Sequence, residues 1–312
     1  MAKVRVLGEV ERRPGAGQAT DALDLARRLP RIAIEARRIA ATAAHGIHGR
    51  RQAGPGEAFW QYRSFSFGEP ANRVDWRRSA RDDRYYVRER EWEAAHTIWL
   101  WIDRSPSMAF TSSLAQAPKI ERALVLGLAL ADLMVRGGER VGHIGLTSPL
   151  ASRSIVDRLC EAMVTDRTAP PDLPDARPLP ALTEAVLIGD FLTPAARVRE
   201  AIETISGRGA RGHVVLVADP VEETFPFEGQ AVLADLEGPQ TLRVGDAGSF
   251  REMYLARMAE HRAALREACA RRGWSFAIHR TDRPASEALL ALAQRISDRG
   301  SGAAPPARAT GG

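Results

Sequence analysis

The sequence predicts an α/β fold for its C-terminal part: a mostly parallel sheet with helices on both faces. Short apolar runs rich in β-branched residues, such as residues 97–102 and 185–188, alternate with longer segments of helical periodicity. Consecutive parallel strands need a crossover connection, and a helix usually provides it. Asp103 follows the first run directly and Asp190 follows the second after one glycine, so both runs end where ligand sites of such sheets lie.

The expected elements follow one another in a regular order. A helix over residues 21–45 is interrupted at Pro30, because proline removes a backbone donor. The expected strands cover residues 97–102, 140–146, 185–188, 213–218 and 274–279, and the expected helices cover residues 120–135, 152–163, 195–206 and 250–272. Residues 230–235 and 240–244 look like an antiparallel pair or edge strands.

Four regions follow from the changes in composition along the chain. Residues 1–20 lack apolar periodicity and residues 299–312 are of low complexity, so both are predicted to be disordered tails. Residues 21–95 form an N-terminal extension whose second half is rich in aromatic and charged side chains. Residues 96–298 form the α/β domain. A disordered linker would lack the aromatic residues, so we expect the extension to be ordered.

The composition excludes several classes of protein. The only cysteines, Cys160 and Cys269, lie far apart without a CxxC spacing, which argues against a disulfide framework or a cysteine-based zinc cluster. The longest apolar stretch, residues 123–135, is shorter than the roughly 20 residues that a membrane span needs. The first 18 residues lack the apolar core of a signal peptide. We therefore expect a cytoplasmic protein without a membrane span.

The formal net charge of +5 raises the alternative of arginine-mediated nucleic-acid binding. The arginines, however, alternate with acids in residues 81–84 and 88–91, a pattern typical of solvated faces and ion pairs. Nearly all basic residues are arginine, since Lys3 and Lys119 are the only lysines. We expect no nucleic-acid partner, and a steep salt dependence of affinity would be the sign of the alternative.

The segment Asp103-Arg104-Ser105-Pro106-Ser107 follows the first strand of the predicted sheet. Its carboxylate and two hydroxyls are hard oxygen donors of the kind that Mg²⁺, Mn²⁺ or Ca²⁺ prefers. Asp190 follows a neighbouring strand and would contact the metal directly or through water. The structural alternative is that these side chains cap the following helix. We predict a metal site at Asp103, Ser105, Ser107 and Asp190, with one coordination position left for an acidic group of a partner.

The motifs favour binding over catalysis. A metal-dependent phosphohydrolase using Asp103 is the enzymatic alternative, but such phosphatases need a second aspartate two residues later, where this chain has Ser105. Neither serine of the segment has the flanking glycines of a nucleophile elbow. The chain also lacks the phosphate-binding P-loop motif and the glycine-rich dinucleotide fingerprint. We expect no catalytic residue and no small-molecule substrate.

A longer signature precedes the α/β domain. It consists of residues 54–59 (GPGEAF), 63–69 (RSFSFGE) and 73–81 (RVDWRRSAR). These segments resemble the hallmark of the bacterial family called domain of unknown function 58, which reads G-x-G-x-x-F, R-x-Y-x-x-G-D and R-x-I-D-W-x-x-S/T-A-R. Phe65 stands for the usual tyrosine and Glu69 for the usual aspartate. The resemblance continues through residues 103–108, 188–191 and 279–284, and so covers most of residues 25–295.

This resemblance implies a von Willebrand factor A-like domain with a metal-ion-dependent adhesion site. The residues that match are Asp103, Ser105 and Ser107 for the first motif and Asp190 for the final acidic motif. Two departures stand out: Gly189 replaces the usual serine, and the middle-motif threonine has no clear match. Thr165 and Thr168 lie in the right interval but outside a Gly-Gly-Thr context.

The family is typically encoded beside MoxR-type AAA+ ATPases, which implies a partner of that kind and a client protein. The expected function is therefore a non-enzymatic, divalent-metal-dependent interaction module that acts with such an ATPase in protein maturation or remodelling. For the hallmark, we expect Asp75 and the arginines at positions 63, 73, 77 and 81 to form an ion-paired patch.

Overall fold

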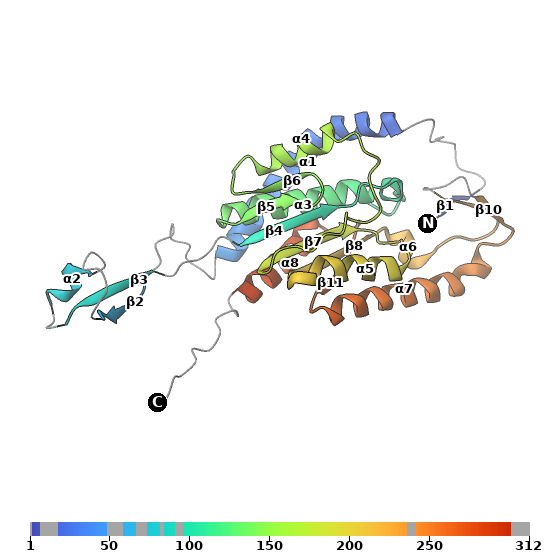
Figure 1. Cartoon of the computed structure of the whole chain (residues 1–312). Coiled ribbons are helices and arrows are strands. Elements are labelled where there is room, and N and C mark those ends of the chain that lie inside the picture. Colours follow the sequence, from blue (N-terminus) through green and yellow to red (C-terminus); the bar gives the residue numbers. More distant parts are fainter. Residues whose placement is uncertain are drawn as a thin grey trace. The chain divides into compact units, whose positions relative to one another are not determined.

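The computed structural model describes residues 2–6, 18–48, 59–66, 74–81, 84–90, 96–235 and 241–300. The chain forms two compact units: Met1–Gly46 together with His96–Gly312, and Ile47–Ala95 (Figure 1). The predicted extension, residues 21–95, is thus divided between them, because its long helix belongs to the same unit as the main sheet.

The larger unit is built on a six-stranded sheet. Its strands are β4 (Thr97–Ile102), β5 (Arg140–His143), β6 (Thr147–Leu150), β7 (Thr183–Gly189), β8 (Arg211–Ala218) and β11 (Ser275–Arg280). They lie in the order β11-β8-β7-β4-β5-β6, and all pairs are parallel except β5 with β6. This is the doubly wound order, which reverses between β4 and β7. The predicted α/β class with a mostly parallel sheet is confirmed.

Helices cover both faces of this sheet (Figure 1). One face carries α3 (Lys119–Arg136), α4 (Ile155–Thr165) and α8 (Ala285–Gly300), and the other carries α5 (Ala195–Ile205) and α7 (Arg251–Arg271). Buried side chains of β4 alternate between the faces: Ile102 packs toward α3, whereas Trp101 belongs to the core under α5 and α7. A Cβ atom at Gly127 of α3 would lie 2.5 Å from the Cδ1 atom of Ile102, so this glycine lets the helix approach the strand closely.

Helix α1 (Gln18–His48) runs without interruption through Pro30, so the predicted break is wrong. Proline costs one backbone hydrogen bond, but the packing of this helix compensates for that loss. Its inner side is a continuous stripe of buried residues: Leu29, Ile32, Ala33, Ala36, Ala40 and Ala43. Arg28 forms an ion pair with Glu121 of α3 at 3.1 Å, and Arg37 forms one with Asp157 of α4 at 2.5 Å.

Of the predicted disordered tail, residues 1–20, the structure describes residues 2–6 as a strand and residues 18–20 as the start of α1, while residues 7–17 lie outside the described residues. Strand β1 (Ala2–Val6) pairs antiparallel with β9 (Ala231–Asp235), and β10 (Thr241–Val244) pairs with β9 on its other side. The two edge-type strands expected at residues 230–244 are therefore a confirmed antiparallel pair with a third member. At the other end, α8 extends to Gly300, while residues 301–312 of the second predicted tail lie outside the described residues.

The smaller unit contains a hairpin of β2 (Phe59–Ser64) and β3 (Tyr86–Arg90) and the short helix α2 (Trp76–Ser79). Asp75 caps this helix, since its Oδ1 atom accepts hydrogen bonds from the backbone N–H groups of Arg77 at 3.1 Å and Arg78 at 3.0 Å. Trp76 is 60% exposed and meets Tyr85 edge-on. The hallmark aspartate is thus a helix cap; Arg73 and the Arg63 side chain of the predicted patch lie outside what the structure describes.

Two further short elements follow strands of the main sheet. The short helix α6 (Pro220–Thr224) follows β8, and the 3-10 turn η2 (Pro106–Ala109) follows β4. No helix in the described ranges has the length and apolar character required to cross a membrane.

Candidate metal centre

The predicted ligands gather where the strand order of the main sheet reverses. Asp103 follows β4 and Asp190 follows β7, and these two strands are parallel neighbours. The backbone N–H of Asp103 donates to the carbonyl of Ile188 at 2.8 Å, which holds the two strand tips together. Both aspartates are almost fully buried, with exposed fractions of 1% and 3%. The topology therefore brings two carboxylates, 87 positions apart in sequence, to one site.

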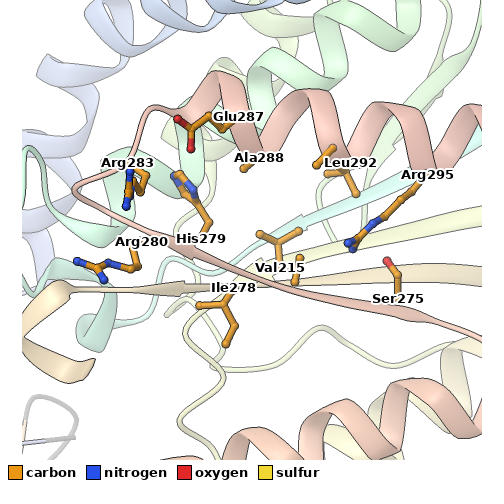
Figure 2. Close-up of a pocket in the computed structure, with 12 residues that line it drawn as sticks. Val215, Ser275, Ile278, His279, Arg280, Arg283, Glu287, Ala288, Leu292 and Arg295 are labelled. Carbon is orange, nitrogen blue, oxygen red and sulfur yellow. The ribbon is translucent and has the colours of Figure 1, made fainter. Parts of the chain in front are cut away.

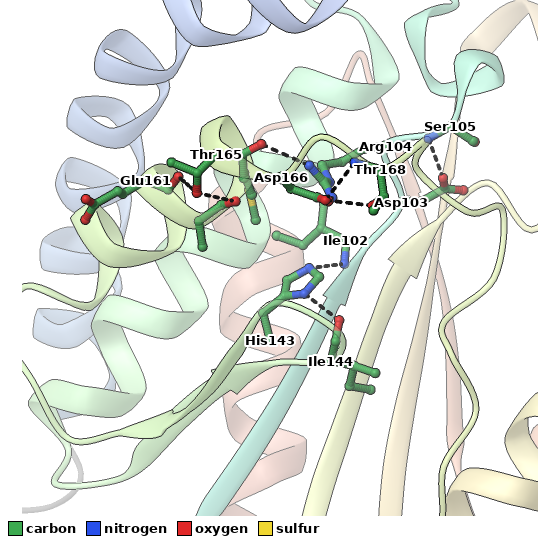
Figure 3. Close-up of polar contacts among 12 residues, drawn as sticks. Ile102, Asp103, Arg104, Ser105, His143, Ile144, Glu161, Thr165, Asp166 and Thr168 are labelled. Carbon is green, nitrogen blue, oxygen red and sulfur yellow. Dashed lines mark hydrogen bonds and ion pairs between the residues drawn. The ribbon is translucent and has the colours of Figure 1, made fainter. Parts of the chain in front are cut away.

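The loop after β4 turns its polar side chains inward. The Oδ1 atom of Asp103 accepts a hydrogen bond from the backbone N–H of Ser105 at 2.8 Å (Figure 3). The Oγ atoms of Ser105 and Ser107 lie 3.1 Å apart, and both serines are buried. Pro106 starts the turn η2 that folds these residues back. The three ligands predicted from the first motif thus lie together in one buried loop.

Gly189 has a steric reason for standing where the family usually has serine. A Cβ atom at this position would lie 2.7 Å from the Cβ atom of Asp103 and 2.9 Å from its Oδ2 atom. Contacts that short force a displacement, so the carboxylate of Asp103 occupies the space that a side chain at residue 189 would fill.

The surroundings of Asp103 disfavour its ionised form, because too little positive charge lies near this carboxylate. Burial, and then the charge of Asp190, raise the pKa of Asp103 to about 7, while the hydrogen bonds from Ser105 and the charge of Lys119 act in the opposite direction. A cation bound at Asp103 would relieve both unfavourable effects, because it would compensate for the lost hydration and offset the charge of Asp190.

A buried lysine that sequence reasoning missed completes the cluster. The Nζ atom of Lys119 donates to Asp190 Oδ2 and to Glu222 Oε1, both at 2.8 Å, and the residue has no exposed surface. Burial opposes its charge, but the carboxylates of Asp190 and Glu222 outweigh burial and raise the pKa of Lys119. One signal was available in the sequence: Lys119 is one of only two lysines in an arginine-rich chain.

Glu222 is held in place by the cap of α6. Asp219 and Glu222 form a reciprocal capping box, in which the backbone N–H of Asp219 donates to Glu222 Oε2 at 3.0 Å. Asp219 also accepts hydrogen bonds from the backbone N–H and the Oγ–H of Ser112, at 2.9 and 2.5 Å. The sequence pattern Asp-Pro-x-Glu after β8 was a readable sign of this cap, although not of its link to Lys119.

The hydroxyls of the two candidate threonines are bonded to other groups. Thr165 Oγ1 donates to the carbonyl of Glu161 within its own helix at 2.8 Å, and Thr168 Oγ1 donates to Asp166 Oδ1 at 2.6 Å. Asp166 in turn accepts a 2.6 Å hydrogen bond from Arg104, whose other nitrogen donates to the carbonyl of Met163 (Figure 3). These contacts attach the loop after β4 to the end of α4, and neither of these two hydroxyls is bonded to a predicted metal ligand.

His143 supports the site from β5. Its Nδ1 atom lies 2.8 Å from the carbonyl oxygen of Ile144, and its Nε2 atom lies 3.2 Å from the backbone nitrogen of Ile102 (Figure 3). Nδ1 must donate and Nε2 must accept, so the imidazole is neutral. Burial lowers the pKa of His143 to about 4, in agreement with this tautomer. The ring therefore fixes the residue immediately before Asp103.

The donor set suits a hard cation. Asp103, Ser105, Ser107 and Asp190 supply only oxygen atoms, and the surplus of carboxylates over the single ammonium of Lys119 leaves negative charge to be neutralised. Among the described side chains, no group of three or more His, Cys, Asp or Glu residues is arranged to hold a metal. Any ion bound here would therefore depend on the two serine hydroxyls as much as on the acids.

A surface pocket lies elsewhere, between β11 and α8. Its volume is about 400 Å³, and Ser275, His279, Arg283 and Arg295 are among its lining residues (Figure 2). None of the four predicted ligands lines it. The candidate metal centre is thus separate from this pocket and is formed by buried strand tips instead of an open cavity.

Comparison with known proteins gives a family and a set of relatives. A family described as "Protein of unknown function DUF58" matches residues 61–264. Uncharacterized proteins of Mycobacterium tuberculosis (Rv1480) and Mycobacterium bovis (Mb1516) are each 27% identical over 259 residues, which cover 77% of this chain and 79% of theirs.

Two solved structures from Bacteroides also match. One is an aerotolerance-related membrane protein of Bacteroides fragilis NCTC 9343, with a TM-score of 0.40, 15% identity and coverage of 65% of this chain and 100% of that chain. The other is the conserved hypothetical protein BatB of Bacteroides thetaiotaomicron, with a TM-score of 0.37, 15% identity and coverage of 66% and 100%.

Proposed function

Because this chain belongs to the family described as protein of unknown function DUF58, we propose its function from its own site: a non-enzymatic module that binds protein partners through a divalent cation. The cation, Mg²⁺ or else Mn²⁺ or Ca²⁺, would be held by Asp103, Ser105, Ser107 and Asp190. The observation that carries this proposal is the burial of two carboxylates and two hydroxyls at adjoining strand tips, where Asp103 has a raised pKa.

The mode of partner binding follows from the small number of protein ligands. Mg²⁺ prefers six oxygen ligands, and the chain offers four side chains here, one of them already bonded to Lys119. An acidic side chain of a partner would complete the coordination shell in place of water. We propose a MoxR-type AAA+ ATPase and a client protein as the partners, on the strength of the family resemblance.

No observation in the site favours the phosphohydrolase alternative. The position of the second acid of such enzymes is Ser105, whose hydroxyl meets Ser107. Lys119, the one buried amine of the cluster, is bonded to Asp190 and Glu222.

Calorimetric titration with MgCl₂ and MnCl₂ tests the metal centre. We expect saturable binding of one ion to the wild-type chain and its loss in Asp103→Asn. Asp157→Asn is the matched control, since Asp157 is an exposed carboxylate on α4. Equal binding by wild type and Asp103→Asn would contradict the metal centre.

A second experiment tests the partner. Purified MoxR-type ATPase from the same organism should be retained by the immobilised wild-type chain in Mg²⁺, and released by EDTA. If the ATPase is retained equally in EDTA and by the Asp103→Asn variant, its binding does not depend on a metal at this site.

A further inference from the structure

We propose that Lys119 sets the metal affinity of this site, because its ammonium group competes with the divalent cation for Asp190. This inference rests on the proposed function and concerns how the same site is regulated. In this view the lysine is a built-in cation that keeps divalent binding weak enough to be reversible.

The geometry places the ammonium in direct contact with a predicted ligand. Lys119 Nζ bridges Asp190 Oδ2 and Glu222 Oε1 at 2.8 Å each, and the lysine side chain is fully buried. Its Nζ atom also lies 5.7 Å from the ring centre of Phe110, on the favourable face for a cation. The ammonium group has three N–H donors, so it can bond two carboxylates that lie in different directions.

Lys119 also limits which oxygen Asp190 offers to a metal. Oδ2 is bonded to the ammonium, while Oδ1 accepts only a long hydrogen bond of 3.2 Å from the backbone N–H of Leu192. A metal held by Asp103 would therefore compete with Lys119 for Oδ2 or share Asp190 through Oδ1. In both cases the attraction between Lys119 and Asp190 opposes the movement of this carboxylate toward the metal.

The charges lead to the same conclusion. Asp103, Asp190 and Glu222 carry three negative charges when ionised, and Lys119 supplies one positive charge, so the cluster has a net charge of 1 − 3 = −2. One divalent ion neutralises it. Without the ammonium the cluster would hold three uncompensated carboxylates, and a divalent ion would be bound more tightly.

Calorimetric titration of the full-length chain with MnCl₂ tests this inference with two opposite variants. Lys119→Met removes the competing charge at similar volume, and we expect Mn²⁺ affinity to rise on the order of 10- to 100-fold. Glu222→Gln leaves the ammonium with Asp190 as its one charged partner, and we expect affinity to fall on the order of tenfold. Arg136→Met is the control: it removes an exposed cation at the far end of the same helix and should leave affinity unchanged.

An equal or lower Mn²⁺ affinity in Lys119→Met would overturn the inference. So would a gain of affinity that survives when Asp103→Asn is added, because the ion would then be bound elsewhere. If Lys119→Met is unstable without metal, its melting temperature measures the same effect: a larger rise with Mn²⁺ than in wild type supports the competition, and an equal or smaller rise refutes it.

The two proposals fail in distinguishable ways. Binding of Mn²⁺ by Lys119→Met but not by wild type would refute the proposed metal-dependent function and support the competition by Lys119. Binding by wild type with no gain in Lys119→Met would keep the function and refute the competition. Binding by neither protein would refute both.

Discussion

At the carboxyl end of the main sheet, one buried ammonium bonds two of three buried carboxylates, whereas at the amino end three polar side chains are bonded in a row. There, Glu184 of β7 lies 3.1 Å from His213 Nε2 of β8, and His213 Nδ1 lies 2.7 Å from Ser275 Oγ of β11. Glu184 and His213 are as buried as the acids at the opposite end.

The two ends differ in the number of acidic side chains that they gather and not in the burial of those side chains. Glu184, His213 and Ser275 stand on three adjacent strands. The register places Ser275 opposite His213, and Glu184 lies two residues before Val186, the register partner of His213. Asp103 and Asp190 stand on loops beyond the strands, and Glu222 stands on the short helix α6, so three acids gather near the single ammonium of Lys119. Three acids near one ammonium are what the proposed cation site requires, whereas one acid bonded to a histidine on the next strand indicates packing.

The largest effects are expected when the basic partner is removed from each end. Lys119→Ala and His213→Ala each leave buried acid without its partner, and each should lower the free energy of unfolding by about 3–5 kcal/mol in urea titrations. Saturating Mn²⁺ should restore part of the loss in Lys119→Ala only, because a cation can replace the ammonium. If Mn²⁺ restored the free energy of unfolding equally in both variants, the two ends of the sheet would not differ in cation binding.

A pH titration gives the next largest effect. Burial lowers the pKa of His143 from 6.5 to about 4. The unfolded chain therefore takes up the proton first, so the contribution of a neutral His143 is present above pH 6.5 and is lost as the pH falls toward 4. The free energy of unfolding should fall by about 3 kcal/mol through this effect.

The measurement is the difference in unfolding free energy between wild type and His143→Gln as a function of pH. Subtraction removes the similar contribution of His279, whose pKa burial also lowers to about 4. A difference that stays constant from pH 7 to pH 4 would show that His143 does not titrate in this way.

Two glycines allow a smaller test of the two ends. A Cβ atom at Gly212 would lie 2.5 Å from the indole of Trp274, and one at Gly189 would lie 2.7 Å from the Cβ atom of Asp103. Gly212→Ala and Gly189→Ala should each cost about 1–3 kcal/mol of unfolding free energy. Only Gly189→Ala should weaken Mn²⁺ binding in calorimetry. Gly207→Ala is the control, because a Cβ atom there would lie 4.0 Å from its nearest neighbour. A loss of Mn²⁺ affinity in Gly212→Ala would show that Mn²⁺ binding is not confined to the carboxyl end of the sheet.

The smallest effect is expected at an exposed ion pair, which serves as a reference for the buried groups at both ends of the sheet. Arg271 and Glu267 form an i, i+4 ion pair on α7 in which both side chains are mostly exposed. Arg271→Ala should change the free energy of unfolding by about 0.5 kcal/mol or less, since water screens such pairs. A change as large as that in Lys119→Ala would mean that burial does not determine the importance of charges in this chain.

The central strands and the first motif were predictable because their signals are local. The apolar run of β4 ends at Asp103 as expected, and helix α3 stops at the predicted glycines. Strand β6 was missed because its four residues include Pro149 and lack a periodic pattern. Strand β1 was missed although its sequence AKVRV alternates apolar and charged residues, the period-2 pattern of a half-exposed strand.

The rest of the site depends on long-range contacts. Lys119 meets Asp190 across 71 positions and Glu222 across 103, and no spacing rule links them. The role of Gly189 was equally hidden, since the shortage of space is created by Asp103 from another strand. Sequence patterns can therefore nominate oxygen donors at strand tips, but the neighbouring charge that tunes them appears only once the fold is known.

Residues 110–118, between the turn η2 and α3, are held by hydrogen bonds from Ser112 to Asp219 and from Gln116 to the carbonyl of Asp282. Between these attachments Leu114 is 53% exposed. A partner that buries this leucine would meet a side chain on a segment already held in shape, so little conformational entropy would be lost from the loop on association. Preorganisation of this kind favours slow dissociation even where the contact area is small.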